Sequence, residues 1–594
     1  MRRTLTLLAA ALIAGGAFAQ ERPDGTGDGR YIVKFRDFAR GAANIAAAGG
    51  RSVVELRPQG AIAAYLPEQA LRALQNNPNV EYVEVDPRRY PSAETLPYGI
   101  PRVQANDPVF TTNAASGSNV MVCIIDSGLD AAHEDFAGYT GAMSGGSDGG
   151  RNSFIDGCGH GTHVAGTIAA LGNNARGVVG VNPKGNLRLH IEKVFDGTPT
   201  ACSWSYVSGL VAALNNCQTA AGTSNLVVNM SLGGSFSSTT ENTAFQNAYN
   251  TGKVMSIAAA GNDGTTRTSY PAGYGSVISV AAVDSAEALA SFSQRNSDVE
   301  LAAPGVAVRS TVPMGTGKEE SLSVGSVGYE APSMEASANG SGTGALVDCG
   351  IGSAGGVPAC AGAAGKVCLI ERGMHSFADK VLSCQNGGGV GAIIFNNTPG
   401  ILTGTLGTTV TTIPSVGISQ ADGLFLRANR LAQTASITVA PGNYAYFDGT
   451  SMATPHVAGV AALVWSLNSS RTNAQVRQAL QSTAKDLGTA GRDSSFGFGL
   501  VRAAAAHNSL NAPAVAPTLN SVTIVTKSRK PYARLAWSGA TGSSVDYYRN
   551  TSAAISTPND GTHDDGPLTK GVSYTYKVCL TGTQTCSGTR TVAP

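Results

Sequence analysis

The sequence predicts an α/β fold with a parallel sheet flanked by helices, and two observations lead to it. From about residue 93, strand-like and helix-like segments alternate, as parallel strands joined by crossover helices require. Residues 119–125 form an unbroken apolar run typical of a fully buried strand, and residues 227–230 and 254–258 follow as two more strands. In open sheets of this kind, ligands and chemistry collect at the carboxyl ends of the strands.

The bulk composition narrows the class of protein. With 594 residues, the chain is too long for one hydrophobic core, which suggests several domains. Its 41 Lys+Arg residues nearly balance its 40 Asp+Glu residues, which argues against nucleic acid or an anionic membrane as the main partner. A charged fraction of only 14% together with 74 glycines favours a tightly packed, loop-rich extracellular protein.

The N-terminus indicates secretion. Two arginines precede an apolar run at residues 5–18 that ends in an Ala-Phe-Ala pattern. This run predicts a secretory signal at residues 1–19 and is too short for a stable membrane span. No later apolar run is long enough to anchor the mature chain, so we expect no transmembrane anchor and an extracellular location. Disulfides are the expected state of the ten cysteines in that oxidising environment.

A compact unit is expected at residues 30–90. Its pattern gives strands and helices in the order βαββαβ, which is the ferredoxin-like arrangement. The expected strands are residues 31–35, 52–56, 61–66 and 80–85, and the expected helices are residues 39–48 and 67–76. Because this unit lies between the signal and a larger domain, we interpret residues 20–92 as a pro-segment.

Polar residues follow the predicted strands and begin a predicted helix. Asp126 ends the strand at 119–125, a position that binds metals in some unrelated folds. Asn262 follows the strand at 254–258, where it either offers an amide donor to a site or stabilises a turn. His160 begins an apolar, glycine-containing helix.

Ser451 opens a small-residue apolar segment that reads as a buried helix. The segment runs to about residue 467, and Pro455 is tolerated because it lies in the first turn. A hydroxyl at this place lies in the positive field of a helix N-terminus, where developing negative charge is stabilised. The alternative is an ordinary serine N-cap.

Two further histidines are expected to be core residues. His163 lies one turn inside the helix that His160 begins, and no Glu or Cys stands at the helical spacing that a zinc site needs. His456 shares a helix with Ser451 at the wrong angular offset to act as its base.

Four residues, each within its own motif and in this chain order, resemble the subtilisin-like serine proteases: Asp126, His160, Asn262 and Ser451. The motifs are Ile-Ile-Asp-Ser-Gly, His-Gly-Thr-His-Val-Ala-Gly-Thr, Ser-Leu-Gly-Gly, Ala-Ala-Gly-Asn and Gly-Thr-Ser-Met-Ala-Thr-Pro-His. The resemblance covers roughly residues 93–313 and 441–512. It implies a subtilisin-like peptidase domain at residues 93–512, preceded by an inhibitor-type propeptide at residues 20–92.

The resemblance also implies a role for each side chain. Ser451 attacks the peptide carbonyl, while His160 takes its proton and later returns it to the leaving amine. Asp126 orients the imidazole and stabilises its cation. The side chain of Asn262 and the backbone N–H of Ser451 form the oxyanion hole. This chemistry needs no cofactor.

A primary specificity pocket is implied beside these residues. Its expected lining residues are Ser231, Leu232, Gly233, Ala258, Ala259, Ala260, Gly261 and Ser269. Because these stretches carry no charge, we expect apolar or aromatic side chains to be preferred over basic ones. Asp263 at the rim is the one residue that would admit some basic side chains.

A structural calcium site is a further implication of the resemblance. Its expected ligands are Glu94, Asp135, Leu171, Asn174, Arg176 and Val178. Oxygen ligands from side chains and backbone suit Ca²⁺. The loop at 171–178 is one residue longer than in the family, so the resemblance does not fix which asparagine binds.

An insert separates the family's core motif at residues 301–305 from the serine. Strands are expected at residues 365–370, 390–395 and 413–418, and a helix at residues 376–386 begins with Ser376 and Asp379 as a capping pair. Residues 316–440 resemble a protease-associated domain, serving as a lid, as a secondary substrate contact or merely as a spacer.

The C-terminal region is expected to be a separate β-sandwich. A Pro/Ala-rich linker at residues 512–517 leads to a tail at residues 518–594, which resembles a fibronectin type III module. The strand-like segments are residues 532–537, 545–548 and 572–578.

Proximity in the sequence suggests four disulfide pairs: Cys202–Cys217, Cys349–Cys360, Cys368–Cys384 and Cys579–Cys586. Cys123 and Cys158 are then left over, and either they pair with each other or Cys123 is a buried free thiol. Sequence alone does not decide the connectivity.

The leading functional hypothesis is a secreted, monomeric endopeptidase made as a zymogen, with protein and peptide substrates. Its propeptide would act as an intramolecular chaperone and inhibitor until it is cut near residues 92–93. An alternative on the same residues is acyl transfer to an amine by a peptide ligase or cyclase. A third hypothesis, an adhesin with an inert core, conflicts with the presence of all four reactive residues.

Overall fold

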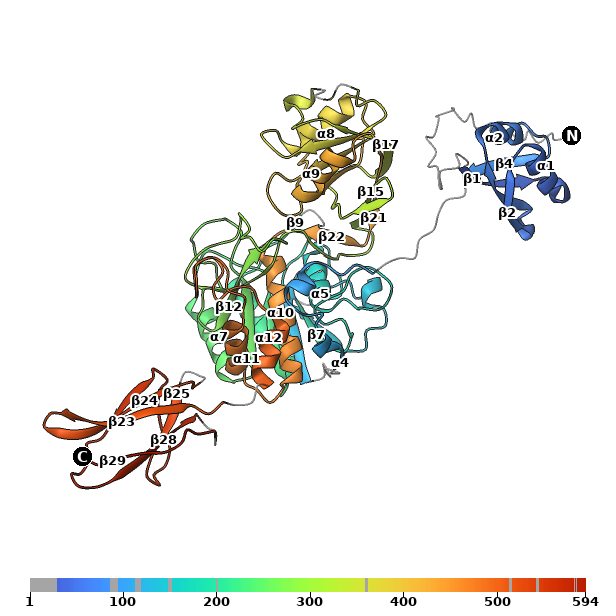
Figure 1. Ribbon diagram of the computed structural model, residues 1–594. Coiled ribbons are helices and arrows are strands. Elements are labelled where there is room, and N and C mark those ends of the chain that lie inside the picture. Colours follow the sequence, from blue (N-terminus) through green and yellow to red (C-terminus); the bar gives the residue numbers. More distant parts are fainter. Residues whose placement is uncertain are drawn as a thin grey trace. The chain divides into compact units, whose positions relative to one another are not determined.

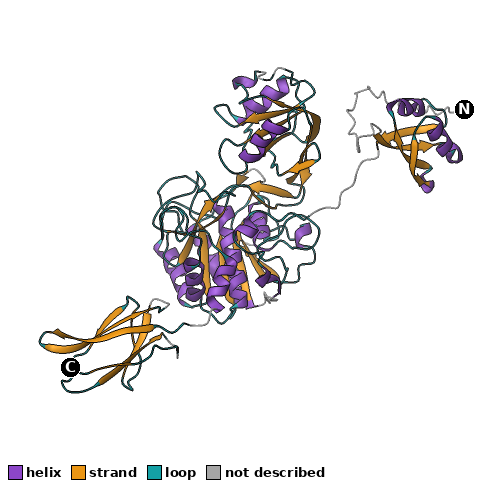
Figure 2. Cartoon of the chain, in the orientation of Figure 1, coloured by secondary structure: helices purple, strands orange, loops and turns teal. Residues whose placement is uncertain are grey.

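The structure is a computed structural model with several separately folded parts (Figures 1 and 2). It describes residues 29–594 except residues 86–93, 113–118, 148–151, 199–200, 358–359, 361, 512–514, 541–543, 582 and 584. The signal expected at residues 1–19 and the processing site expected near residues 92–93 lie outside the described residues, as does part of the linker.

The N-terminal part is a four-stranded antiparallel sheet with two helices. Its strands are β1 (Gly29–Phe35), β2 (Arg51–Leu56), β3 (Ala61–Leu66) and β4 (Val80–Val85), and its helices are α1 (Gly41–Ala47) and α2 (Glu68–Gln75). The strand order is β2-β3-β1-β4. Apolar side chains of the sheet, among them Val33 and Ile62, pack with Ile45 and Leu74 of the helices. This is the βαββαβ arrangement that the sequence predicts.

The largest sheet has seven strands, all parallel, in the order β13-β12-β11-β10-β5-β7-β6. The strands are β5 (Val120–Asp126), β6 (Met143–Ser147), β7 (Arg188–Lys193), β10 (Asn225–Met230), β11 (Val254–Ala259), β12 (Val277–Val283) and β13 (Val299–Pro304). Every residue of β5, β10 and β11 is buried, as the unbroken apolar runs predict.

Helices cover both faces of this sheet. On one face, α6 (Val207–Ala221) and α7 (Thr239–Asn250) pack on side chains that include Leu226, Val228 and Met230 of β10. The helices α5 (His160–Ala169) and α10 (Thr450–Leu467) pack against each other and against β5. The remaining helices of this part are α3 (Gly99–Arg102), α4 (Pro108–Thr112), α11 (Asn473–Ser482) and α12 (Ala503–Asn511).

The helix α10 is 18 residues long, and all but three of them, namely Ser451, Ser466 and Leu467, are buried. Its apolar character therefore reflects a place in the protein core, between the sheet and α5. Among the described residues, no helix combines the length and hydropathy needed to cross a membrane.

The insert is built on a seven-stranded mixed sheet in the order β16-β15-β21-β17-β18-β19-β20. The strands are β15 (Gly317–Val324), β16 (Val327–Tyr329), β17 (Gly340–Asp348), β18 (Val367–Glu371), β19 (Gly391–Phe395), β20 (Ser415–Ile418) and β21 (Thr434–Gly442). Two helices, α8 (Phe377–Asn386) and α9 (Gln420–Asn429), complete it. The predicted cap of α8 is present, since Ser376 Oγ accepts from Asp379 N at 3.1 Å. The antiparallel pair β14 (Val308–Thr311) and β22 (Tyr444–Phe447) stands at the two ends of the insert.

The C-terminal unit, described here by itself, consists of two antiparallel sheets, as the alternating pattern predicts. One sheet has the order β23-β24-β27 and the other β26-β25-β28-β29. The strands are β23 (Thr518–Lys527), β24 (Lys530–Ser538), β25 (Ser544–Arg549), β26 (Ile555–Pro558), β27 (Thr562–Asp565), β28 (Tyr574–Leu580) and β29 (Arg590–Val592). Trp537, Tyr547 and Tyr576 lie in its core.

All ten cysteines form disulfides; the predicted pair Cys202–Cys217 is wrong, and so are both alternatives given for Cys123 and Cys158. Cys349–Cys360, Cys368–Cys384 and Cys579–Cys586 are paired as expected. Cys217, however, pairs with Cys123, and Cys202 pairs with Cys158. The reason is packing across the sheet: Cys123 on β5 and Cys217 on α6 belong to one core cluster although 94 positions separate them in the chain.

Candidate active site

Asp126 and His160 meet at the carboxyl end of the parallel sheet. Asp126 is the last residue of β5 and fully buried, and His160 is the first residue of α5. Asp126 Oδ1 lies 2.8 Å from His160 Nδ1 and also accepts from Ser127 N at 2.8 Å. A Cβ on Gly161 would lie 2.2 Å from the carbonyl oxygen of Gly128, so glycine permits the close approach of α5 to the end of β5.

The electrostatic surroundings of His160 favour its protonated form. Burial by itself lowers the pKa of His160. The charge of Asp126 and its hydrogen bond, together with the charge of Asp156, outweigh this effect, and the pKa is raised above its ordinary value. An imidazole in this setting takes up a proton readily while its Nδ1 is held by a carboxylate.

Ser451 is the second residue of α10 and lines a cavity that adjoins the cavity lined by His160. The two cavities share Leu232, Gly233 and Gly234. The backbone of Ser451 is held by Ser231, whose hydroxyl donates to the Ser451 carbonyl oxygen at 2.7 Å. Within the described part of the chain, no hydrogen bond joins the Ser451 hydroxyl to His160.

Asn262 is oriented by the residue before Ser451. Its Oδ1 accepts from both the backbone N and the Oγ1 of Thr450, each at 2.8 Å. These two bonds fix the amide so that Nδ2 remains as the donor. Asn262 itself is exposed and lines the same cavity as Ser451. An amide donor beside a nucleophilic serine at a helix N-terminus can stabilise a developing oxyanion.

The cavity beside Ser451 has a volume of about 200 Å³. The predicted residues that line it are Leu232, Gly233, Ala259, Gly261 and Ser269. Three predicted residues do not line it: Ser231, which bonds to the backbone of Ser451, and Ala258 and Ala260, which are buried in core clusters. Successive side chains alternate along β11, so Ala258 faces the opposite side of the sheet from Ala259.

Residues outside the predicted stretches also line this cavity, and two of them are charged. Asp263 and Arg267 both line the cavity, as do Thr268 and the buried Gln294. Gln294 Oε1 accepts from Thr265 N at 2.8 Å, and its Nε2 lies 3.4 Å from Asp263 Oδ2. Sequence reasoning missed Arg267, Thr268 and Gln294 because they come from loops beyond the motif that carries Asn262.

A second cavity, of about 350 Å³, was not predicted from the sequence. It is lined by His160, Phe195 and Cys202, and by exposed aromatic residues that include Trp204 and Phe236. Trp204 is 71% exposed and Phe236 is 88% exposed, which is unusual for such large side chains. Exposed aromatic residues in this number favour contacts with apolar side chains of a bound chain.

His163 and His456 are buried core residues, as the sequence predicts. His163 Nε2 lies 2.9 Å from the carbonyl oxygen of Val308, and burial lowers the pKa of His163 to about 3. His456 Nδ1 lies 2.9 Å from the carbonyl oxygen of Met452, and burial lowers the pKa of His456 to about 4. Both imidazoles are therefore neutral at neutral pH.

The residues expected to bind calcium gather around Asp135 but satisfy one another. Asp135 Oδ1 accepts from Asn174 Nδ2 at 3.0 Å, and Asp135 Oδ2 accepts from Val178 N at 2.9 Å. Asn174 Oδ1 accepts from Arg176 N at 2.9 Å, and Glu94 Oε1 accepts from Asn174 N at 3.3 Å. These side-chain oxygens therefore accept hydrogen bonds from the loop itself, and a Ca²⁺ ion would share them with these donors. Leu171 belongs to the same loop and donates its N–H to the Asp135 carbonyl oxygen.

Comparisons with known proteins agree with this geometry. A model of the Subtilase family matches residues 117–346 and 418–499, and a model of the PA domain matches residues 342–426. The insert is thus a PA, or protease-associated, domain within the larger domain.

Among similar proteins is subtilisin amylosacchariticus from Bacillus subtilis subsp. amylosacchariticus, which is 38% identical over 325 residues, or 52% of this chain and 81% of the relative. Subtilisin J from Geobacillus stearothermophilus is 40% identical over 298 residues, covering 48% of this chain and 74% of the relative. A solved structure of a psychrophilic subtilisin-like protease from an Antarctic Pseudoalteromonas is 41% identical, with a TM-score of 0.62, and covers 70% of this chain and 98% of that chain.

Proposed function

Because the chain belongs to the subtilase family and is a subtilisin-like serine endopeptidase, we propose that Ser451, His160 and Asp126 hydrolyse peptide bonds through an acyl-enzyme. The observation that carries this assignment is the 2.8 Å contact between Asp126 and His160, beside the adjoining cavities that Ser451 and His160 line. Proteins and peptides are the substrates of this family.

Ser451 is the nucleophile in this mechanism, and His160 is its base. His160 Nε2 takes the hydroxyl proton as the serine attacks the carbonyl carbon, and it returns that proton to the leaving amine. Asp126 accepts the hydrogen bond from His160 Nδ1, which keeps the imidazole in the tautomer that leaves Nε2 free to act as a base. Water then enters and gives a proton to His160 as its oxygen attacks the acyl carbonyl; the Ser451 oxygen leaves and takes that proton from His160.

The negative charge on the carbonyl oxygen is stabilised by two donors, the Nδ2 of Asn262 and the backbone N–H of Ser451. Thr450 supports this assignment, because its two hydrogen bonds to Asn262 Oδ1 present Nδ2 as the free donor. The first turn of α10 adds the positive end of the helix dipole.

We assign the 200 Å³ cavity to the side chain before the scissile bond and propose that uncharged side chains, apolar or aromatic, bind there best. Its walls include Gly233, Gly234 and Ala259, whose small or absent side chains leave room for a bound side chain. The two charged lining residues, Asp263 and Arg267, are exposed and opposite in sign, so the cavity has no net charge to select a basic partner. A kcat/KM profile led by Arg or Lys would refute this preference.

We propose from the N-terminal sequence how the chain is secreted and processed before it becomes active. A signal at residues 1–19 directs secretion, and the relatives that match this chain are secreted subtilisins. The ferredoxin-like unit is proposed to be a propeptide that assists folding and inhibits the enzyme until cleavage near residue 93. The mature enzyme is proposed to act as a monomer, and the C-terminal sandwich as a fibronectin type III-like accessory module.

Subtilases bind calcium as a structural ion, and the catalytic chemistry itself needs no cofactor. We propose that the loop at residues 171–178 keeps its shape without calcium, because Asp135 and Asn174 already accept hydrogen bonds from its N–H groups.

The test of the proposed function compares the secreted protein with its Ser451→Ala variant. We expect the wild type to hydrolyse fluorogenic peptides and to release a fragment ending near residue 93. The variant should fold, accumulate with residues 20–92 still attached, and show no hydrolysis above background. Equal hydrolysis by both proteins would remove Ser451 from the mechanism.

A further inference from the structure

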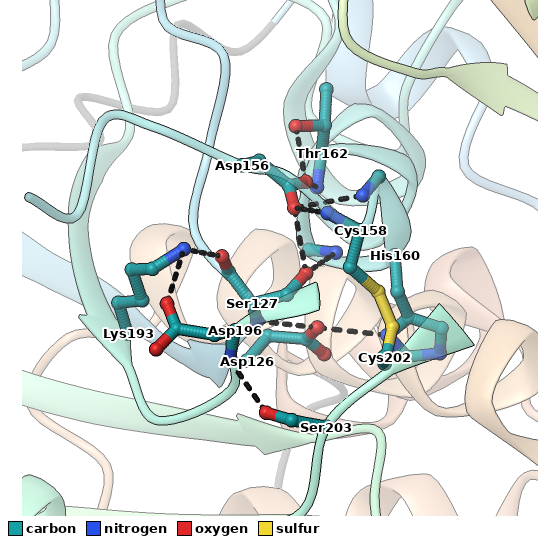
Figure 3. Close-up of a disulfide and its surroundings, with 12 residues drawn as sticks. Asp126, Ser127, Asp156, Cys158, His160, Thr162, Lys193, Asp196, Cys202 and Ser203 are labelled. Carbon is teal, nitrogen blue, oxygen red and sulfur yellow. Dashed lines mark hydrogen bonds and ion pairs between the residues drawn. A yellow bond between two sulfur atoms is a disulfide. The ribbon is translucent and has the colours of Figure 1, made fainter. Parts of the chain in front are cut away.

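A buried carboxylate that the proposed mechanism does not use lies in the loop before His160. Asp156 is 7% exposed and precedes α5 by four residues (Figure 3). It accepts five hydrogen bonds: from Ser127 Oγ at 2.9 Å, Cys158 N at 3.2 Å, Gly159 N at 2.8 Å, Thr162 N at 2.8 Å and Thr162 Oγ1 at 2.7 Å. Three of these donors are backbone N–H groups at the start of α5, which have no partner within the helix.

These bonds join the two elements that carry Asp126 and His160. Ser127 follows Asp126 in the chain and donates its N–H to Asp126 Oδ1. The hydroxyl of Ser127 donates to Asp156 and accepts from Gly161 N at 2.8 Å, in the first turn of α5. One carboxylate therefore connects the end of β5 to the beginning of α5, and the 2.8 Å contact between Asp126 and His160 spans the same junction.

Lys193 also bridges the segment after β5 and the loop that precedes α5. This ammonium group donates to the carbonyl oxygens of Ser127 at 2.8 Å and Ile155 at 2.7 Å, and it pairs with Asp196 at 3.6 Å. The loop that carries Asp156 is also linked to the substrate side, since Cys158 is bonded to Cys202 in the lining of the second cavity (Figure 3).

Asp156 also contributes charge to the site. The titratable and charged groups around His160 are Asp126 on β5, Asp156 in the preceding loop, His163 on α5, Lys193 on β7 and Glu241 on α7, which lines the same cavity. His163 is neutral because burial lowers its pKa to about 3. The pKa of His160 is raised by Asp126 first and by Asp156 in addition, against the effect of burial.

We propose that Asp156 is a positioning residue for proteolysis, which holds His160 against Asp126 through Ser127 and the first turn of α5 and adds negative charge beside the imidazolium that forms during the reaction. The proposal rests on the proposed function of Ser451, His160 and Asp126. A purely structural helix cap would make the same hydrogen bonds, but its loss would change only the fraction of folded enzyme.

The test is the Asp156→Asn variant of the self-processed enzyme, with rates expressed per active site titrated by a serine-directed phosphonate. Asparagine keeps the size of the side chain but removes its charge and one acceptor. We expect kcat to fall about tenfold to a hundredfold with little change in KM, because small misplacements of catalytic groups cost rate and not ground-state binding.

The pH profile separates a positioning role from a structural one. Proteolysis requires neutral His160, so kcat/KM rises as pH rises through the pKa of His160. Removing the charge of Asp156 lowers this pKa, and the acid limb should therefore move to lower pH in Asp156→Asn. The matched control is Glu300→Gln, which removes another buried carboxylate that pairs with Arg477 away from both cavities. In this control we expect the wild-type acid limb.

A second variant covers the case in which Asp156→Asn does not fold. Ser127→Ala removes the hydroxyl that links Asp156 to Gly161 but keeps the charge. We expect a lower kcat per titrated site with an unchanged acid limb. The inference is overturned if the variants keep wild-type kcat and pH profile per titrated site and lose only folded enzyme. A wild type without Ser451-dependent hydrolysis would instead refute the proposed function.

Discussion

The loops before and after helix α5 each contain hydrogen bonds to a buried aspartate, and the two aspartates differ in what lies next to them. At the N-terminal end, Asp156 accepts from three backbone N–H groups and two hydroxyls beside His160. Beyond the C-terminal end, Asp135 accepts from Asn174 and Val178 in the loop that follows the helix. Similar hydrogen bonding therefore supports catalysis at one end and only loop structure at the other.

This difference shows that the hydrogen bonds of a carboxylate do not by themselves assign its function. Burial raises the pKa of Asp135 in spite of its hydrogen bonds to Val178 and Asn174. Asp156 follows Ile155, whose carbonyl oxygen accepts from Lys193, and its charge raises the pKa of His160. What distinguishes the two ends is the reactive group that each carboxylate helps to place.

The largest effect is expected at the catalytic end. Asp126→Asn removes the carboxylate that fixes the tautomer of His160, and the amide can donate to Nδ1 instead. We expect kcat to fall about 10⁴-fold, as it does when this residue is changed in another serine protease, while KM and the melting temperature change little. The measurement is hydrolysis of a fluorogenic peptide together with thermal unfolding. A decrease of less than tenfold would mean that Asp126 does not orient the base.

A smaller effect, on stability and not on rate, is expected at the other end. Asp135→Ala leaves Asn174 Nδ2 and Val178 N without their acceptor. An unsatisfied buried donor costs about 1–3 kcal/mol, so the free energy of unfolding should decrease by about that amount. Denaturant unfolding of the inhibited enzyme measures this change. If Asp135→Ala lowers kcat per titrated site as much as Asp156→Asn does, the distinction between a stabilising Asp135 and a positioning Asp156 is wrong.

The residues proposed to react could be selected from the sequence because each lies in a contiguous motif with its own local structure. The apolar run of β5 delivers Asp126 to the sheet edge, and His160 and Ser451 begin helices whose small residues allow close packing. The strand order of the sheet then brings these motifs together, as the alternating pattern of strands and helices indicates.

Other features depend on packing between distant segments and were not predicted. Cys123 and Cys217 meet only because α6 covers β5, so pairing by closeness in the sequence failed. Arg267 and Gln294 reach the 200 Å³ cavity from different loops. Asp156 lies four residues before His160 in the chain, but its partner Ser127 follows another strand, and spacing along the chain cannot reveal that bond.

The smallest effect is expected when calcium is removed. Asp135 and Asn174 accept hydrogen bonds from N–H groups of the loop at residues 171–178. EDTA should therefore change the melting temperature of neither the wild type nor Asp135→Ala. Thermal unfolding with and without EDTA checks this expectation. A large decrease for the wild type alone would show that calcium binds at Asp135 after rearrangement of the loop.

The central claim is that Asp126, His160 and Ser451 form one nucleophilic site, and labelling with a serine-directed phosphonate tests it most directly. Mass spectrometry of the labelled enzyme should locate a single adduct on the peptide that contains Ser451. The adduct should form far more slowly in His160→Ala, because the base that activates the hydroxyl is then missing. Labelling at another serine, or labelling of Ser451 at the same rate without His160, would contradict the account.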